Sequence, residues 1–313
     1  RRQRQMCIRD RYETLLKAFD RENEVFKKRV GKDRVMATYR ARVRARNHVA
    51  AFIKSFYRRS DMSMLELTPD FIKEFAAYLS TEAGLRNGSI WANCMWLKGV
   101  VMKAHYNGLI PRNPFIQFHI SPNVKEREYL TEDELKAVMT HEFADSKLAY
   151  IRDIFIFASF TALSFVDIQE LTNDNIVEVN GEKWILSKRH KTKVAFQVKL
   201  LDIPLQIVER YRPMQKDNRI FPGLNYWSIC KPLKRMIREC GITKSISFHC
   251  SRHGFATLAL SKGMPIESVS RVLGHTNIVT TQLYAKITTQ KLDNDLTMFG
   301  DKLSKTFNGI TMS

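Results

Sequence analysis

The sequence predicts a mainly α-helical protein that carries one small antiparallel β-sheet and is divided into two domains. Apolar residues recur at helical spacing over most of the chain. One segment near residue 180 instead places two apolar runs on either side of an Asn–Gly pair, which is typical of a β-hairpin. A length of 313 residues favours two domains of ordinary size.

Helices account for the predicted first domain, residues 35–120. The first helix carries an apolar stripe at helical spacing, formed by Val49, Phe52, Ile53, Phe56 and Tyr57. The second begins at Thr68 and Pro69, a favourable N-cap followed by a proline at the first helical position. The third extends from near Ser89 to just before Gly108, and an extended stretch follows that glycine.

The predicted second domain, residues 125–313, follows a linker near residues 118–128. Its first helix starts with a capping box, in which Thr131 is the N-cap and Glu134 returns the hydrogen bond. Helices are expected to continue from there to about Leu171.

The apolar pattern then changes from helical to strand-like. Ile176–Val179 and Lys183–Leu186 are joined by Asn180–Gly181, which predicts a hairpin with a primed turn. Val194–Leu200 is a candidate third strand of the same sheet. Helices are predicted again from Pro204 to the end of the chain.

The charge of the chain indicates a polyanionic partner. The formal net charge is +19, an excess that most often serves nucleic-acid binding. Residues 1–60 hold 19 Lys/Arg against 6 Asp/Glu, and residues 181–240 hold 14 against 5. Residues 121–180 are acidic, with 5 against 12. Two separated basic zones suggest a DNA-facing surface on each domain, and solvated helix faces are the alternative.

A membrane partner is not favoured. The longest nearly apolar run, Ile154–Val166, has 13 residues, whereas a spanning helix needs about 20. The run therefore predicts a buried core helix.

Neither a metal nor a cofactor is expected. The five cysteines are odd in number and form no CxxC pair, which fits a reducing cytoplasm. His249, Cys250 and His253 lack a second cysteine pair at zinc-finger spacing. The sequence also has no GxxxxGK[ST] loop that would bind ATP.

Four residues within a short C-terminal stretch suit phosphoryl transfer on a nucleic-acid backbone. Arg252 can fork onto phosphate oxygens. His249 and His275 can donate hydrogen bonds or carry protons. Tyr284 can act as a covalent nucleophile. Taken singly, each also fits an ordinary structural role, as a surface arginine, a satisfied histidine or a helix-face tyrosine.

The order of these motifs resembles the catalytic domain of the tyrosine recombinases, or phage-type integrases, and in particular their branch on Bacteroidetes mobile elements. The resemblance begins near residue 35, and the segment 108–115 resembles the end of that family's helical core-binding domain. It implies a helical core-binding domain followed by a tyrosine-recombinase catalytic domain. The motifs that carry it are Thr161-Ala-Leu-Ser164, Arg189-His-Lys191-Thr192, His249-x-x-Arg252, Leu273-Gly-His275 and Tyr284-Ala-Lys.

The resemblance implies a role for each matching residue. Tyr284 would attack the scissile phosphate and form a 3′-phosphotyrosyl link, leaving a free 5′-hydroxyl. Arg252 would bind the non-bridging oxygens, with His275 supporting the same phosphate. His249 would be a hydrogen-bond donor or an acid–base group. Lys191 would protonate the 5′-oxygen as it leaves; a solvated lysine is the alternative.

One position departs from the family pattern. Ser164 stands where the family usually has its first catalytic arginine, and serine cannot supply a charged fork to phosphate. The Bacteroidetes branch also carries serine there. We expect Arg189 to replace the missing guanidinium, since strand alternation would place it on the same face as Lys191. Asp167 either orients the catalytic groups or caps a helix.

The predicted function is site-specific DNA recombination, in the integration or excision of a mobile element. The expected partner is double-stranded DNA. The expected location is the bacterial cytoplasm, in association with the nucleoid. Residues 1–34 form a basic segment that could be the remnant of an arm-binding region. The candidate DNA-binding side chains are Arg40, Arg42, Arg44, Arg46 and Lys193.

The family works as a tetramer on two DNA sites, so a homotetramer is expected, with a host DNA-bending protein or an excisionase as possible partners. The tail after Tyr284 is predicted to form a helix over Ile287–Leu303, which would dock on a neighbouring protomer or on its own domain. Two alternatives remain: a relaxing enzyme like the type IB topoisomerases, and a catalytically weakened DNA-binding protein.

Overall fold

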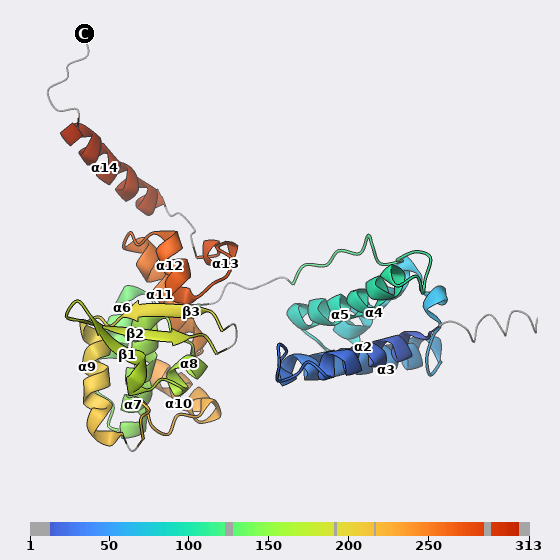
Figure 1. The fold of residues 1–313 in the computed structure, drawn as a ribbon, viewed down its shortest axis with the longest axis horizontal. Helices are drawn as coiled ribbons and strands as arrows, with labels where there is room; N and C mark the ends of the chain where they lie inside the picture. Colours follow the sequence, from blue (N-terminus) through green and yellow to red (C-terminus); the bar gives the residue numbers. More distant parts are fainter. Residues whose placement is uncertain (1–12, 123–127, 191–192, 216, 285–288, 307–313) are drawn as a thin grey trace, which may run out of the picture. The chain divides into compact units, whose positions relative to one another are not determined.

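The computed structural model describes residues 13–122, 128–190, 193–215, 217–284 and 289–306 (Figure 1). The chain divides into two compact units, with the boundary between residues 125 and 126. Each unit has its own hydrophobic core.

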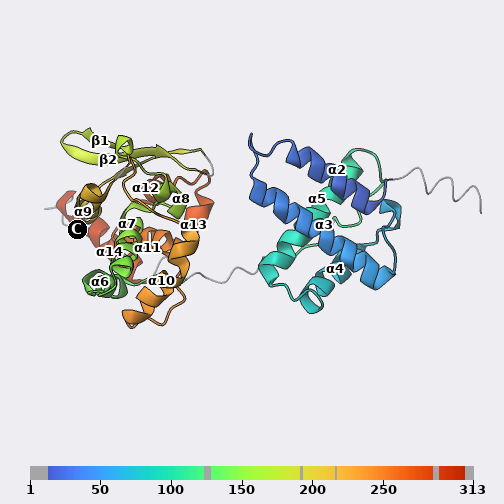
Figure 2. The ribbon, with the colours of Figure 1, turned by 90° about the horizontal axis from the view of Figure 1, so that it is seen from below.

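Unit 1 is a helical bundle, as predicted. Figure 2 shows the helices of this unit packed around one another. Their core is rich in aromatic rings, in which the Phe52 ring centroid lies 5.2 Å from that of Phe71 and 5.6 Å from that of Phe75. Thr68 stands at the N-cap of the second predicted helix, as expected, although its side chain makes no capping hydrogen bond, and the third helix ends before Gly108. The elements are α2 (Leu15–Lys27), α3 (Met36–Tyr57), the 3₁₀ turn η1 (Met64–Glu66), α4 (Pro69–Thr81) and α5 (Asn87–Tyr106).

Helix α2 is not among the predicted helices, because the excess of Lys and Arg in residues 1–34 predicts a basic extension. Its residues Leu15, Leu16, Ala18 and Phe19 are nevertheless buried against α3 and α5. This apolar face makes α2 an integral part of the first core, despite the positive charge around it.

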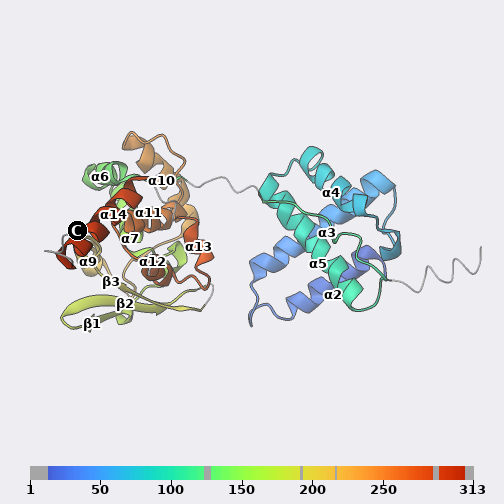
Figure 3. The same cartoon turned by 90° about the horizontal axis from the view of Figure 1, so that it is seen from above.

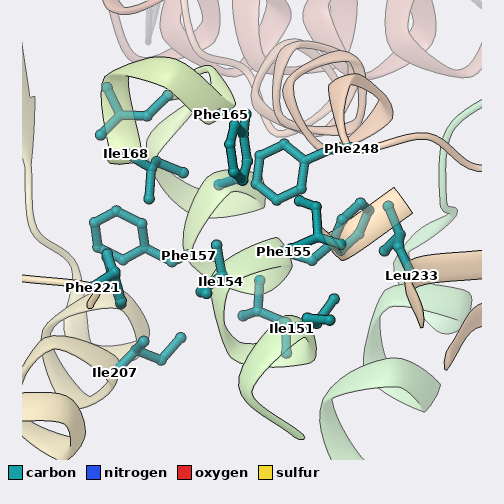
Figure 4. Packing of buried hydrophobic residues seen from close by; sticks show 14 of the residues in the cluster. Ile151, Ile154, Phe155, Phe157, Phe165, Ile168, Ile207, Phe221, Leu233 and Phe248 are labelled. Atoms are coloured by element: carbon teal, nitrogen blue, oxygen red, sulfur yellow. The ribbon is translucent and has the colours of Figure 1, made fainter. Parts of the chain in front are cut away.

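Unit 2 is organised around the buried helix α7 (Ser146–Thr161). Its apolar side chains pack on all sides, and Phe155, Phe157 and Ile154 lie in the centre of the core (Figure 4). The helices that contact α7 are α6 (Glu132–Thr140), α9 (Asp202–Tyr211), α10 (Tyr226–Glu239) and α11 (His249–Ser261). The capping box of Thr131 and Glu134 at the start of α6 is confirmed.

The apolar run Ile154–Val166 does not form one helix, contrary to the prediction. Helix α7 ends at Thr161, and Ala162 adopts the left-handed conformation with φ +56°. Ser164 then caps the short helix α8 (Phe165–Gln169). An alanine in the left-handed region is rare, so the break could not be inferred from composition.

The predicted hairpin and third strand are confirmed. The sheet has the order β1-β2-β3 and is antiparallel, and it lies on the side of unit 2 opposite α6 and α10 (Figure 2 and Figure 3). Asn180 and Gly181 both have positive φ, as a type I′ turn requires. The strands are β1 (Ile176–Val179), β2 (Glu182–Lys188) and β3 (Ala195–Lys199), and the adjoining 3₁₀ turns are η2 (Asn173–Asn175) and η3 (Arg212–Met214).

The C-terminal part contains α12 (Ile266–Leu273), α13 (Val279–Gln282) and α14 (Thr289–Thr306). The predicted tail helix is therefore present. Its apolar side chains Leu292, Leu296 and Phe299 are about half exposed. In the part of the chain that the structure describes, no helix is long and apolar enough to cross a membrane.

Candidate active site

Arg252 forms the centre of the candidate site. It lies on α11 and is buried, and its guanidinium donates to the main-chain oxygens of Ala162, at 2.8 Å, and of Leu273. These carbonyls mark the C-terminal ends of α7 and α12, where the helix dipole favours a cation. Burial, and after it the charge of Arg189, lowers the pKa of Arg252 to about 10, so the guanidinium is charged at neutral pH.

Arg189 lies beside Arg252, although it comes from the loop after β2. Its Nη1 donates to Asp167 at 2.7 Å, and its Nη2 donates to the main-chain oxygen of Val272 at 2.5 Å. The residue is 5% exposed, and its guanidinium lies 4.1 Å from the centre of the Phe196 ring. Two of its five N–H donors are thus occupied by protein.

The prediction that Arg189 lies on a strand, with a side chain that alternates with its neighbours, is wrong. Strand β2 ends at Lys188, and Arg189 and Val194 form the hydrogen bond that closes the loop to β3. Arg189 points into the site because Asp167 and Val272 hold it there. Lys191, its predicted partner, lies outside the described residues.

Asp167 connects α8 to this loop. One carboxylate oxygen accepts from Arg189 and from the Ser164 hydroxyl at 2.8 Å, and the other accepts from the main-chain N–H of His190 at 3.0 Å. Burial raises the pKa of Asp167, but the hydrogen bonds from His190, Arg189 and Ser164 outweigh it and leave the pKa below its usual value. Asp167 therefore both caps α8 and orients Arg189.

Ser164 has a structural part in this arrangement. It is the N-cap of α8 and forms a reciprocal capping box with Asp167. A hydroxyl at this position supports the Asp167 carboxylate that holds Arg189. Ser164 and Arg189 are thus linked through one acidic side chain.

Gly274 ends α12 against the Arg189 side chain. Its φ is +62°, and a Cβ at this position would lie 2.9 Å from Nε of Arg189. Left-handed backbone and close approach both favour glycine here.

Replacing Gly274 by alanine is expected to slow DNA cleavage about tenfold, because the new methyl group displaces the Arg189 guanidinium by a fraction of an ångström. Stability should fall by about 1 kcal/mol from the left-handed alanine alone. The matched control is Gly263→Ala, which has φ +89° but nothing within 4 Å of the added Cβ. Equal cleavage rates for the two variants, measured in a single turnover, would contradict the steric argument.

His275 follows Gly274 and is held by a residue that sequence reasoning missed. Its Nδ1 lies 2.8 Å from the hydroxyl of Thr281, which is fully buried. Burial, together with the positive charges of Arg252 and Arg189, lowers the pKa of His275 to about 4, so the ring is neutral at pH 7. A hydroxyl that donates to Nδ1 leaves the ring proton on Nε2, where it can be donated to a phosphate.

Thr281→Val is expected to slow cleavage about tenfold while DNA affinity stays within twofold, because valine keeps the shape but releases the His275 ring. Thr281→Ser should restore the rate. Single-turnover cleavage at saturating protein, with DNA binding measured in parallel, separates the two effects. A valine variant that cleaves as fast as the wild type would show that the hydroxyl has no orienting role.

Three aromatic rings form a row beside the two arginines. The ring of His249 lies 4.8 Å from that of His253, and the ring of His253 lies 5.1 Å from that of Tyr284. Tyr284 also packs against a small cluster that includes Ala162 and Ala256. The phenol therefore lies near the phosphate-binding candidate Arg252.

The candidate DNA-binding residues are not equivalent. Arg40 and Arg44 are exposed on α3, and Lys193 is exposed in the loop between β2 and β3. Arg46 is partly exposed and pairs with Asp20 at 2.8 Å.

Arg42 corrects the prediction for this group. It is 9% exposed, donates to Asn23 at 2.9 Å and lies over the Trp96 ring, 4.9 Å from its centre. Residues two apart on a helix point in directions about 200° apart. Four alternating arginines therefore cannot share one face, and Arg42 turns inward.

Among the described residues, no group of three or more His, Cys, Asp or Glu side chains is placed to hold a metal ion. The site brings together Arg252, Arg189, Asp167, His275 and Tyr284 around the ends of α7 and α12. Such an arrangement offers two guanidinium charges, a neutral imidazole and a phenol, which suits attack on a phosphodiester.

Comparisons with known proteins match most of both units. The model of the Phage integrase family matches residues 128–291, and that of the Phage integrase SAM-like domain matches residues 14–120. Tyrosine recombinase XerC of Lactobacillus leichmannii is 25% identical over 68% of this chain and 77% of its own length. Tyrosine recombinase XerA of Pyrococcus horikoshii is 32% identical over 52% of this chain, and the match spans 58% of XerA.

Solved structures share the fold. The Tn1549 transposon integrase in complex with a circular intermediate DNA has a TM-score of 0.76 at 17% identity, over 91% of this chain and 99% of its own. A lambda integrase tetramer bound to a Holliday junction has a TM-score of 0.67 at 17% identity, over 88% of this chain and 78% of its own. The matched family models, together with the arginine, histidine and tyrosine cluster, show that this chain belongs to the phage integrase family of tyrosine recombinases, the site-specific DNA recombinases.

Proposed function

We propose that this chain cleaves and rejoins double-stranded DNA at a specific site through a 3′-phosphotyrosine intermediate, in the integration or excision of a mobile element. The observation that carries the proposal is the position of Tyr284 next to His253 and within electrostatic reach of Arg252. The fold shared with a transposon integrase supports the mobile-element role.

In the proposed reaction the Tyr284 phenol gives its proton to a base, for which His249 is the candidate, its oxygen attacks phosphorus, and the bond from phosphorus to the 5′-oxygen breaks. The electron pair leaves with that oxygen, which takes a proton from Lys191. Arg252 and His275 donate to the non-bridging oxygens as their charge grows in the transition state. His249, exposed at the start of α11, is the remaining acid–base or donor group. Rejoining is the reverse, with a 5′-hydroxyl attacking the phosphotyrosine.

Arg189 is proposed to supply the positive charge that Ser164 lacks. Its positive charge lies close enough to Arg252 to lower the pKa of Arg252. It also lowers the pKa of His275. Its fixed position, set by Asp167 and Val272, avoids reorganisation when the phosphate arrives.

DNA contact is proposed for the exposed cations Arg40, Arg44 and Lys193. Each phosphate that such a residue neutralises releases counterions, so affinity should fall steeply with salt. Arg46, which pairs with Asp20, is a weaker candidate for DNA contact. Arg42 is buried and is therefore not proposed as a DNA contact.

The proposed assembly is a homotetramer on two DNA sites, with a host DNA-bending protein or an excisionase as further candidates. The tetrameric lambda integrase on a Holliday junction shares this fold. In this arrangement the exposed apolar side chains of α14 (Leu292, Leu296, Phe299) would dock on a neighbouring protomer.

The decisive experiment supplies the wild-type protein with its cognate site as a nicked suicide substrate and as two intact duplexes. A covalent protein–DNA band together with recombinant junction products is the expected result. Relaxed circles without junctions would favour an enzyme like the type IB topoisomerases. Sequence-specific binding without a covalent band would favour a catalytically weakened DNA-binding protein, which Ser164 alone would suggest.

A further inference from the structure

His253 occupies a position that the proposed reaction does not use. It follows Arg252 on α11, yet the two side chains contact different groups. Arg252 reaches the carbonyls of Ala162 and Leu273, whereas the His253 ring contacts the rings of His249 and Tyr284. His253 is half-buried, while His249 is exposed.

The direction of the Tyr284 phenol depends on such side-chain contacts. Tyr284 follows α13, a helix of only four residues, and its neighbour Leu283 is 75% exposed. So short a helix gives little rigidity by itself. Among the contacts of Tyr284 are the His253 ring, 5.1 Å away between ring centroids with an interplanar angle of 54°, and the small cluster that contains Ala256.

We propose that His253 is a positioning residue for Tyr284, which sets the direction of the phenol by ring packing. This inference rests on the proposed function, since it assumes that Tyr284 is the nucleophile. The His249 ring also contacts the His253 ring, with 4.8 Å between the ring centroids and an interplanar angle of 89°. His249 and His253 are four residues apart on α11, so the helix itself fixes their spacing.

The expected consequence is confined to steps in which the phenol attacks. In-line attack needs the reacting atoms about 3–3.5 Å apart, and a misplacement of about 1 Å can cost about 10²-fold in rate. Loss of the His253 ring should therefore slow cleavage. It should spare a reaction that uses the same phosphate-binding groups without the phenol.

The test compares His253→Ala and His253→Phe in the full chain. Single-turnover cleavage of the nicked suicide substrate should be about 10- to 100-fold slower for His253→Ala, and within about threefold of wild type for His253→Phe, which keeps a ring. The matched control is Thr257→Val, which removes a hydroxyl bond to the His253 carbonyl one turn further along α11. It should cleave at the wild-type rate.

A second measurement removes the nucleophile from the reaction. In a Tyr284→Phe background, a DNA strand that ends in a 3′-p-nitrophenyl phosphate is joined to a 5′-hydroxyl strand. The p-nitrophenolate leaves, so no tyrosine is needed. Adding His253→Ala to this background should change the joining rate by less than twofold.

Several results would overturn the proposal. His253→Ala could cleave as fast as wild type, or joining could fall as much as cleavage, which would place His253 at the phosphate or in general stability. His253→Phe as slow as His253→Ala would assign the role to a ring nitrogen. A wild-type protein that forms no adduct refutes the proposed function, whereas an active wild type matched by His253→Ala refutes only the role of His253.

Discussion

Tyr284→Phe is expected to form no covalent adduct with a nicked suicide substrate, with cleavage reduced by at least about 10⁴-fold, the scale seen when a covalent nucleophile is removed. The phenol oxygen is the attacking atom, and phenylalanine lacks it. The ring itself should stay in place, because its contacts with His253 and the cluster around Ala256 are made by carbon atoms. Denaturing gels of the trapped product measure the effect directly.

The control for this variant is DNA binding. Affinity for the intact site should stay within about twofold, because the proposed phosphate contacts come from arginines and lysines. A covalent band that persists in Tyr284→Phe would move the nucleophile to another residue. Lost binding would instead show that the phenol supports the fold of the site.

Arg189→Met is expected to damage both stability and cleavage. The substitution leaves Asp167 buried without its cation, which typically costs about 3–5 kcal/mol. Cleavage should fall by about 10²–10³-fold, comparable to the loss of one donor to a developing oxyanion. Urea unfolding and single-turnover cleavage measure the two effects.

The double variant Asp167→Asn/Arg189→Met separates them. Asparagine still offers an oxygen to the N–H of His190 and carries no charge, so most of the lost stability should return. Cleavage should remain as slow as in the single variant, because the guanidinium is still missing. A double variant that cleaves near the wild-type rate would exclude Arg189 as the substitute for the family arginine.

Local signals in the sequence predicted much of the fold. The Asn180–Gly181 turn and the capping box of Thr131 depend on a few neighbouring residues, and both are present. The break at Ala162 was not predictable, because an alanine with φ +56° is imposed by its surroundings rather than by propensity. Helix α2 was not predicted, because its apolar residues lie within a strongly basic segment whose charge suggested an extension.

In the candidate site, too, some features could be predicted from the sequence and others depend on the folded structure. The motifs predicted Arg252, His275 and Tyr284 as site residues, because the spacing of these motifs can be read directly from the sequence. The contacts of Thr281 with His275 and of His253 with Tyr284 arise only when α11, α12 and α13 are assembled. Helical geometry alone showed that the four alternating arginines cannot share a face, but that Arg42 turns inward follows from its contacts with Asn23 and Trp96.

The anchoring of Arg252 and Arg189 has a consequence for the chain while it is being synthesised. Arg252 is held by carbonyls 90 residues before it and 21 residues after it, and Arg189 is held by one 83 residues further on. During synthesis, a chain that has not yet emerged beyond Leu273 cannot seat either guanidinium. Both guanidinium groups therefore gain their main-chain anchors only after the segment up to Leu273 has been made.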